Sequence, residues 1–308
     1  MPYSPRIAAW LAWLCIFLLV APVHAERLQP GPTHARASQV VAELLSRYHY
    51  RDQSIDDRLS ESVYASYFDT LDPQRFYFLQ SDIDSFASQR FELDDELSKG
   101  RLDTAYAIFA RYKQRVAERS EYALAMLDDG IDFDSQASFE LDREGAPWAS
   151  SREALDEVWQ RRVTNDALTQ TLNGRAMDEV VSSLKSRYQR LTRTLEQYSP
   201  EDVFQTFMST WAAEFDPHSS YMSPRTSENF DINMSLSLEG IGAMLSNEGD
   251  FVEIVELIPG GPAAGSGELA SGDRIVGVGD RCRRFDSWRQ GLGCALTYPA
   301  GEHVRAIA

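Results

Sequence analysis

The sequence predicts a multidomain α + β protein, in which a helical N-terminal domain is followed by a small β-rich domain. Three observations lead to this fold class. Apolar residues recur at helical spacing from about residue 38 to residue 198. After about residue 233 they alternate instead with glycine and polar residues, as they do in strands. A short apolar segment precedes both regions and has the form of an export signal.

The first 25 residues have the pattern of a signal peptide. Arg6 supplies the positive start, residues 7–20 form the apolar run, and Ala25 precedes the predicted cleavage site at Glu26. The alternative is a membrane anchor. A helix over residues 7–20 extends only about 21 Å, which is short of a hydrocarbon core of about 30 Å. We therefore expect export with cleavage.

The helical domain is expected over residues 26–230. Two apolar stripes open it, and each is expected to bury against another helix. The first stripe contains Val40, Val41, Leu44, Leu45 and Tyr48, and the second contains Leu59, Val63, Tyr67 and Phe68. Further helices are predicted at residues 102–127, 152–170, 177–197 and 201–215, and Trp148, Trp159 and Trp211 are expected in the core or at a domain interface.

The last of these helices has a clear predicted start. Ser199 can cap it, and Pro200 suits the first helical position. Glu201 and Asp202 place negative charge at the positive end of the helix.

The segment that follows this helix, residues 216–221, contains an acid, a base and a nucleophile side by side. Neighbours in an extended segment point to opposite faces, whereas a catalytic triad is assembled by the fold. We therefore interpret the segment as a capped turn, in which His218 bonds backbone groups.

The β-rich domain is expected over residues 231–308. Residues 241–246 alternate, residues 247–250 supply a turn, and residues 251–257 alternate again, which predicts a β-hairpin. A third strand is predicted at residues 274–278. The domain boundary is placed near residues 225–235, in a segment expected to be loop.

Glycines at the start of this domain suggest a binding loop. A phosphate loop is followed by a helix, whose free N–H groups meet the phosphate, but here a strand follows Gly240 and Gly242. A loop that opens an edge strand can instead hold a peptide's terminal carboxylate while the peptide pairs with the strand. The predicted peptide-binding residues are Leu238, Glu239, Gly240, Ile241, Gly242, Ala243, Met244 and Leu245.

Charge and composition argue against several other functions. The formal net charge of −17 opposes a nucleic-acid or anionic-lipid partner, since both need fields of Lys and Arg. No cofactor is expected. The acidic residues 128–134 resemble a calcium loop only in charge, because Ile131 and Phe133 occupy ligand positions. Asp94, Asp95 and Glu96 are interpreted as an exposed helix start.

The cysteines predict no metal site. Cys282 and Cys294 have no companion ligands at zinc spacing. An oxidising compartment permits them to pair, and the sequence leaves both the paired and the unpaired state open.

At this point the motifs carry a family resemblance. Residues 235–245, 260–264 and 272–279 resemble the PDZ domain of carboxy-terminal processing proteases. Residues 216–225 are more narrowly similar to the tail-specific proteases of the Gram-negative periplasm. Residues 47–50, 142–148 and 201–204 look like the helical N-terminal domain of that family.

The resemblance implies a periplasmic serine endopeptidase. It also allows association of the enzyme with the inner membrane. Such an enzyme recognises apolar C-terminal tails of misfolded or tagged proteins through its PDZ domain, and cuts them with a Ser-Lys dyad. In relatives a lipoprotein adaptor can bind the helical domain. The lysines Lys99, Lys113 and Lys185 lie in the helical half and match no family motif, so no catalytic residue is assigned in this chain.

The chain departs from the family after Gly279. An amphipathic helix should form the far wall of the PDZ groove there, but residues 280–298 are basic and interrupted by glycines. Our hypothesis is that the coding frame was disturbed around residues 280–297 and ended early, so that the protease domain is absent.

Two alternatives remain. The chain can be a partial sequence of a working protease, or it can be a stand-alone adaptor that binds peptides without cleaving them. Sequencing the downstream DNA distinguishes the disturbed frame from the partial sequence.

Overall fold

The computed structural model describes residues 28–133, 137–235, 240–248, 251–279, 294–298 and 305–306. The chain divides into two compact units, Met1–Arg225 and Thr226–Ala308. The signal peptide predicted over residues 1–25, with its cleavage site at Ala25 and Glu26, lies outside the described residues. Within the described part of the chain, no helix is both long enough and apolar enough to cross a membrane.

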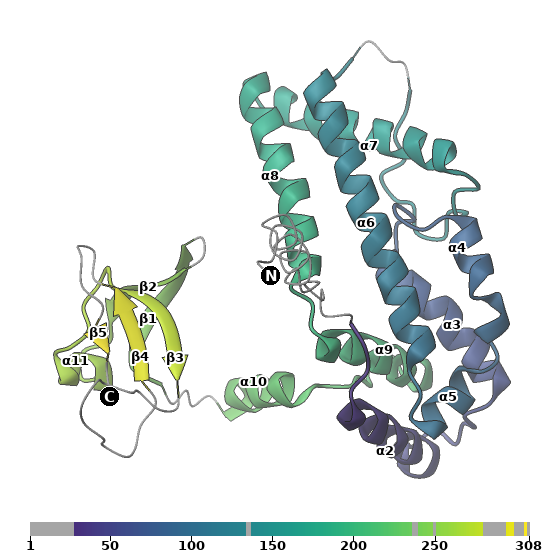
Figure 1. Ribbon diagram of the computed structural model, residues 1–308, viewed down its shortest axis with the longest axis horizontal. Helices are drawn as coiled ribbons and strands as arrows, with labels where there is room; N and C mark the ends of the chain where they lie inside the picture. The colour runs from purple at the N-terminus through teal and green to yellow at the C-terminus, as the bar shows by residue number, and fades with distance from the viewer. Residues whose placement is uncertain are drawn as a thin grey trace, which may run out of the picture. The chain divides into compact units, whose positions relative to one another are not determined.

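The first unit is helical, as the sequence predicted (Figure 1). Its helices are α2 (Pro32–Tyr48), α3 (Asp57–Leu71), α4 (Gln80–Ser85), the 3₁₀ turn η1 (Ala87–Gln89), α5 (Leu93–Lys99), α6 (Asp103–Asp129), α7 (Arg152–Leu172), α8 (Met177–Glu196) and α9 (Pro200–Phe215). The long helix α6 contacts α7, α8, α9 and α3. The predicted helices all form, and their ends differ from prediction by a few residues.

Side-chain caps set several helix starts. Asp56 accepts hydrogen bonds from the amides of Arg58 and Leu59, both at 3.1 Å, at the start of α3. At α9, Ser199 and Asp202 cap each other's backbone amides, and Pro200 occupies the first turn. The predicted start of α9 is therefore confirmed.

Aromatic side chains dominate the helical core. Trp159 and Trp211 are fully buried, and Trp148 packs against the core partly buried, so the prediction of core tryptophans is confirmed. The Trp159 indole donates to the Phe76 carbonyl at 2.5 Å. The second predicted stripe is buried as expected, with Val63 and Tyr67 wholly inaccessible.

The first predicted stripe is confirmed only in part. Val41 and Leu45 pack partly buried against the core, but Val40 and Leu44 are each 50% exposed and Tyr48 is 75% exposed. The buried residues of α2 are small or polar and lie at positions 34, 38 and 42. A Cβ added at Gly100 would lie 2.8 Å from the Ala35 carbonyl oxygen, so α2 approaches the end of α5 closely, and such an approach needs small side chains at the contact.

The segment near the predicted domain boundary also differs from prediction. Residues 223–229, expected as loop, lie almost entirely in helix α10 (Pro224–Ser235). None of its residues is buried, and even the apolar side chains of Phe230 and Met234 are exposed. The segment has apolar residues at helical spacing, but it also contains Ser, Thr and Asn, which favour turns and helix caps. These polar residues led to the prediction of a loop.

The second unit is built on an antiparallel sheet with the order β1-β2-β3-β4-β5. The strands are β1 (Ala243–Glu248), β2 (Phe251–Leu257), β3 (Arg274–Gly279), β4 (Cys294–Tyr298) and β5 (Arg305–Ala306), and the short helix α11 (Pro262–Ser266) follows β2. The predicted hairpin and third strand are thus confirmed. Residues 280–293, where the sequence departs from the family and Cys282 lies, are outside the described residues, and so is the side chain of Cys294.

Candidate peptide-binding site

The candidate site is the loop at residues 240–242 together with strand β1. Gly240, Ile241 and Gly242 lie in the loop, and Ala243, Met244 and Leu245 begin the strand. Leu238 and Glu239, also predicted to bind peptide, lie outside the described residues.

Backbone hydrogen bonds hold the carbonyl groups of this loop inward. The Ile258 amide donates to the Gly242 carbonyl at 2.8 Å, and the Ala263 amide donates to the Ile241 carbonyl at 2.8 Å. Among the described residues, no acceptor pairs with the backbone amides of Gly240, Ile241 or Gly242. Two carbonyls of the loop are therefore bonded within the unit, while its three amides are bonded to no described acceptor, and amide donors of this kind are what an anion requires.

Two glycines make this arrangement possible. Gly242 has φ of +72°, which favours glycine, and a Cβ built on it would lie 2.9 Å from the Gly261 Cα. Gly261 lies within the predicted family motif at residues 260–264, but its role as a packing partner of the loop could not be found from spacing alone, because it depends on the close approach of two loops 19 positions apart in the chain.

Strand β1 lies at one edge of the described sheet (Figure 1), since β2 is the one described strand with which it pairs. An edge strand presents unpaired N–H and C=O groups that can pair with another chain. The β1–β2 register skips Val255, so β2 carries a bulge opposite the start of β1. The Ser271 hydroxyl donates to the Val255 carbonyl and holds this bulge.

Exposed apolar side chains surround the edge strand. Ile241 is 41% exposed, Met244 54% and Leu245 46%, while Ala243 packs partly buried against the small core of Ile254, Ala263 and Leu269. Arg274 on β3 pairs with Glu253 at 3.7 Å. The groups of the loop that can donate to a carboxylate are its backbone amides.

The predicted turn after α9 has a mixed outcome. The Ser219 amide donates to the Asp216 carbonyl at 2.8 Å, which confirms the turn. His218 is exposed, and no backbone group within the described residues bonds its ring, so its predicted role is wrong. The turn lies in the first unit, where the Ser219 hydroxyl pairs with Nε2 of His49 at 3.3 Å and not with the His218 ring, so within the described residues its own acid, base and nucleophile do not form a triad.

The acidic cluster at α5 is less exposed than predicted. Asp94, Asp95 and Glu96 do begin the helix, which confirms their place. Asp94 and Glu96, however, are half-buried, and burial raises the pKa of both carboxyl groups. Glu96 accepts from the Thr104 hydroxyl at 2.8 Å, which ties α5 to α6.

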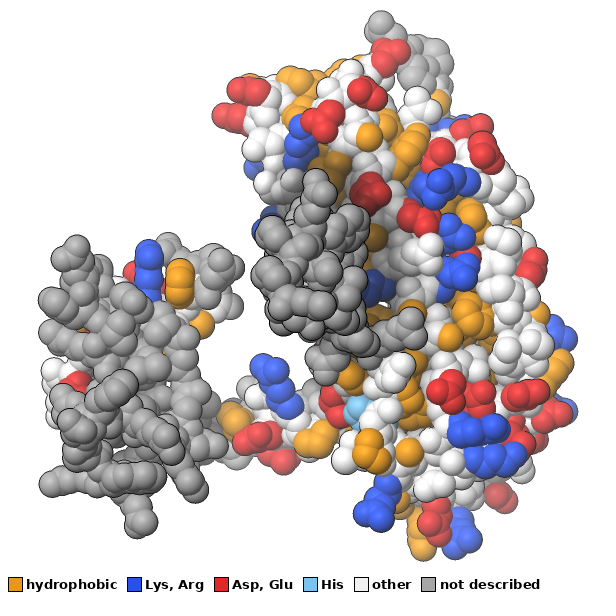
Figure 2. Space-filling view, in the orientation of Figure 1, with side chains coloured by type: hydrophobic (Ala, Val, Ile, Leu, Met, Phe, Trp, Pro, Cys, Tyr) orange, Lys and Arg blue, Asp and Glu red, His pale blue; other side chains and the backbone are white. Residues whose placement is uncertain are grey.

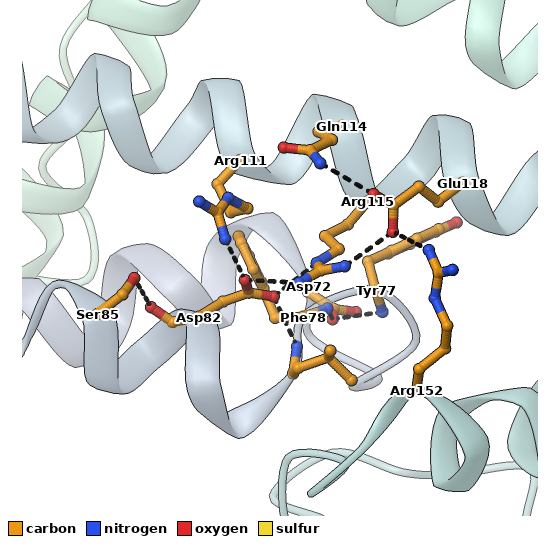
Figure 3. Close-up of polar contacts among 11 residues, drawn as sticks. Asp72, Tyr77, Phe78, Asp82, Ser85, Arg111, Gln114, Arg115, Glu118 and Arg152 are labelled. Atoms are coloured by element: carbon orange, nitrogen blue, oxygen red, sulfur yellow. Dashed lines mark hydrogen bonds and ion pairs between the residues drawn. The ribbon is translucent and has the colours of Figure 1, made fainter.

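A charged network in the helical unit is the other concentration of polar groups (Figure 3). The fully buried Asp82 on α4 accepts from Arg111 at 2.7 Å and from Arg115 at 2.8 and 2.9 Å, both on α6. Arg115 also donates to Glu118, which in turn accepts from Arg152 at the start of α7. Burial acts to raise the pKa of Asp82, but the hydrogen bonds from Arg115, the Leu79 amide and Arg111 hold it below its usual range. Every member is paired, so we interpret this network as structural.

These features define a class of protein, in which a helical domain is joined to a small antiparallel sheet. The edge strand of that sheet is preceded by a glycine-containing loop. Residues 40–225 match the model of the tail specific protease N-terminal domain family. The chain therefore belongs to the tail-specific protease family through its helical domain.

One relative extends this comparison. The tail-specific protease of Haemophilus influenzae (strain ATCC 51907 / DSM 11121 / KW20 / Rd) is 39% identical over 237 residues. That match covers 76% of this chain and 34% of the relative, so the chain spans about a third of the relative's length.

Proposed function

We propose that this chain is the non-catalytic, substrate-recognising part of a periplasmic tail-specific serine endopeptidase. Its second unit acts as a PDZ module that captures apolar C-terminal tails of substrate proteins. The observation that carries the proposal is the set of available loop amides at residues 240–242, placed at the start of the edge strand β1.

The loop and the strand supply the two parts of tail capture. The loop amides can donate hydrogen bonds to the terminal carboxylate, and charge-assisted bonds of this kind are about twice as strong as neutral ones. Strand β1 can add the tail as a further strand, while the exposed Ile241 and Leu245 contact its apolar side chains. Peptides that end in a free carboxylate and apolar residues fit this combination.

Proteolysis belongs to the proposal only through the family. A Ser-Lys dyad uses lysine as the general base for the serine nucleophile. Lys99, Lys113 and Lys185 lie on α5, α6 and α8, outside the unit that contains the candidate site, and no dyad role is assigned to them. We propose in addition a periplasmic location after removal of residues 1–25, and a lipoprotein adaptor as a partner of the helical domain.

The alternative function is a stand-alone exported adaptor that binds tails without cleaving them. The same geometry supports both, since tail capture needs no catalytic side chain. Mass spectrometry of a bound peptide, after incubation with the protein as cells produce it, separates them: cleavage supports the protease and an intact peptide supports the adaptor.

Peptide titration tests the capture itself. Fluorescence anisotropy compares a peptide that has an apolar free C-terminus with the same peptide amidated, and we expect at least tenfold weaker binding after amidation, because the amide replaces a charged acceptor. Equal affinity for the two peptides contradicts carboxylate capture.

A charge placed in the loop gives a second, independent test. Ile241→Asp puts a carboxylate beside the amides and is expected to weaken binding at least tenfold by competition and repulsion. Phe251→Asp is the matched control, because Phe251 is 43% exposed but pairs with Glu248, at the end of the β1–β2 hairpin that lies away from the loop. Equal losses in both variants contradict the assignment of the loop.

A further inference from the structure

Helix α2 is held to the helical unit by few buried groups, and one of them is a histidine. Only His34, Ser38 and Ala42 are buried along its length. The His34 ring stacks on Phe204 of α9, with ring centroids 4.8 Å apart and planes 16° apart. The His34 ring is therefore one of the contacts that attach α2, beside the partly buried Val41 and Leu45 and the Ser38 hydroxyl, which lies 3.4 Å from the Leu97 carbonyl.

Both ring nitrogens of His34 are engaged. Nε2 lies 2.9 Å from a carboxylate oxygen of Glu201, in the first turn of α9. Nδ1 accepts from the Gly31 amide at 3.0 Å, immediately before α2. With Nδ1 accepting, the ring proton sits on Nε2 and donates to Glu201, so this geometry describes the neutral ring.

A second group competes for Nδ1. The Tyr106 oxygen, from α6, lies 3.2 Å from Nδ1, but its hydroxyl donates to the Pro200 carbonyl at 2.7 Å. In the neutral ring no hydrogen lies between the Tyr106 oxygen and Nδ1 of His34. The hydroxyl hydrogen of Tyr106 points to Pro200, and the ring hydrogen on Nε2 points to Glu201. A proton on Nδ1 would complete that contact, since the tyrosine oxygen can accept while its hydroxyl donates.

We propose that His34 is a proton-driven clasp for the chain segment ahead of α2. When Nδ1 takes a proton from solvent, it leaves the Gly31 amide and donates to the Tyr106 oxygen instead. The ring then carries a positive charge against Glu201, and residues 28–31 lose the hydrogen bond that ties them to the ring. If the predicted cleavage site is used, this segment begins only two residues after the new N-terminus.

The groups that surround the ring support a proton-coupled exchange. Glu201 faces it from α9, with its other oxygen buried and unpartnered among the described residues. Tyr106 faces it from α6, and burial followed by the charge of Glu201 raises the pKa of that phenol, which keeps it protonated. Tyr221 packs edge-on against Phe204, and burial together with the charge of Glu201 raises the pKa of its phenol. Histidine is the side chain whose charge ordinarily changes between about pH 5 and 8.

NMR on the full chain tests the clasp. The ring nitrogen shifts of His34 and the protection factor of the Gly31 amide are followed from pH 8 to pH 5. We expect the protection factor to fall about fivefold as Nδ1 gains its proton, the effect of losing one hydrogen bond. The two midpoints must coincide, and titration of the ring without any change at Gly31 overturns the proposal.

Variants sharpen the test. Tyr106→Phe removes the acceptor for the protonated Nδ1, so both midpoints should move to lower pH together, and a move to higher pH contradicts the clasp. His34→Gln should make the Gly31 protection factor independent of pH.

His49→Gln is the matched control. The Nδ1 atom of His49 also accepts a hydrogen bond from a backbone amide, but its ring faces the Ser219 hydroxyl. This substitution should leave the protection factor of Gly31 unchanged. Should His34→Gln fail to fold, coincidence of the wild-type midpoints decides the question.

Discussion

Gly242 and Gly261 face each other so closely that a Cβ on either residue would lie within 3.0 Å of the other's Cα. Gly242→Ala is therefore expected to destabilise the second unit by about 2 kcal/mol or more, through the strained φ of +72° and the contact with backbone. Urea unfolding followed in the β1–β2 hairpin measures this change. Gly265→Ala is the control, since nothing lies within 4 Å of its added Cβ, and it should be neutral or stabilising. Equal effects of the two substitutions contradict the glycine contact.

Asp82→Asn is expected to destabilise the helical unit by about 3 to 5 kcal/mol at neutral pH, because Arg115 and Arg111 lose a buried charged partner.

The same substitution should change the pH dependence of unfolding. The pKa of Asp82 is lowered in the folded state, so the stability that its carboxylate gives the unit is present above the unfolded pKa of about 3.9. That stability is lost as pH falls through the folded value. Acid unfolding followed by circular dichroism should therefore show a weaker pH dependence in the variant below about pH 4. Asp84→Asn, at an exposed site on the same helix, serves as the control. An unchanged acid profile in Asp82→Asn contradicts this account.

Alkaline pH is expected to unfold the helical unit through its buried phenols. Burial raises the pKa of Tyr64 to about 12, and burial likewise raises the pKa of Tyr67. A raised folded pKa contributes stability below the unfolded value of about 10, and that stability is lost as pH rises further. Denaturant unfolding at pH 8 and pH 11 measures the loss.

Tyr64→Phe isolates one phenol. It removes a hydrogen bond of 2.5 Å to the Ile83 carbonyl, which should cost about 1 kcal/mol at pH 8. The additional loss between pH 8 and pH 11 should be smaller in the variant than in the wild type. A larger loss in Tyr64→Phe is the result that contradicts this prediction.

The two fully buried tryptophans are expected to respond differently to replacement by Phe. The Trp159 indole donates to the Phe76 carbonyl, whereas the Trp211 indole nitrogen is buried without a partner among the described residues. Both substitutions leave a similar cavity, but only Trp159→Phe orphans a buried carbonyl. Trp159→Phe should therefore destabilise the unit by about 1 to 3 kcal/mol more than Trp211→Phe in chemical unfolding. The opposite order would show that packing at Trp211 outweighs the hydrogen bond.

Helix periodicity and capping residues predicted most of the helical unit, because these signals act within a few residues of each other. The face of α2 could be predicted only in part, since Val41 and Leu45 pack against the core but Val40 and Leu44 do not. Packing of α2 is decided by the close approach of the Gly100 turn, which lies 65 positions from Ala35 in the chain and favours Ser38 and Ala42 over Val40 and Leu44. Patterns of hydrophobicity count apolar residues and do not register how near another backbone comes.

Prediction of the candidate site reached the loop but not its support. Gly240 and Gly242 stand out in the sequence because a strand follows them. The amides of Ile258 and Ala263 that bind the loop carbonyls carry no side-chain signature, so a sequence pattern cannot assign them. Acidic and basic side chains interleave over the visible face of the helical unit, and such a surface likewise gives no local signal for a partner (Figure 2).

Helix α10 buries none of its residues, so packing against a core adds little to its stability. A helix of about 12 residues is marginal in water without such support. As a helix it is about 18 Å long, and as an extended chain it would be about 40 Å long. Melting of this one segment would therefore more than double its length, so the length of this part of the chain is set by a helix–coil equilibrium and responds to temperature.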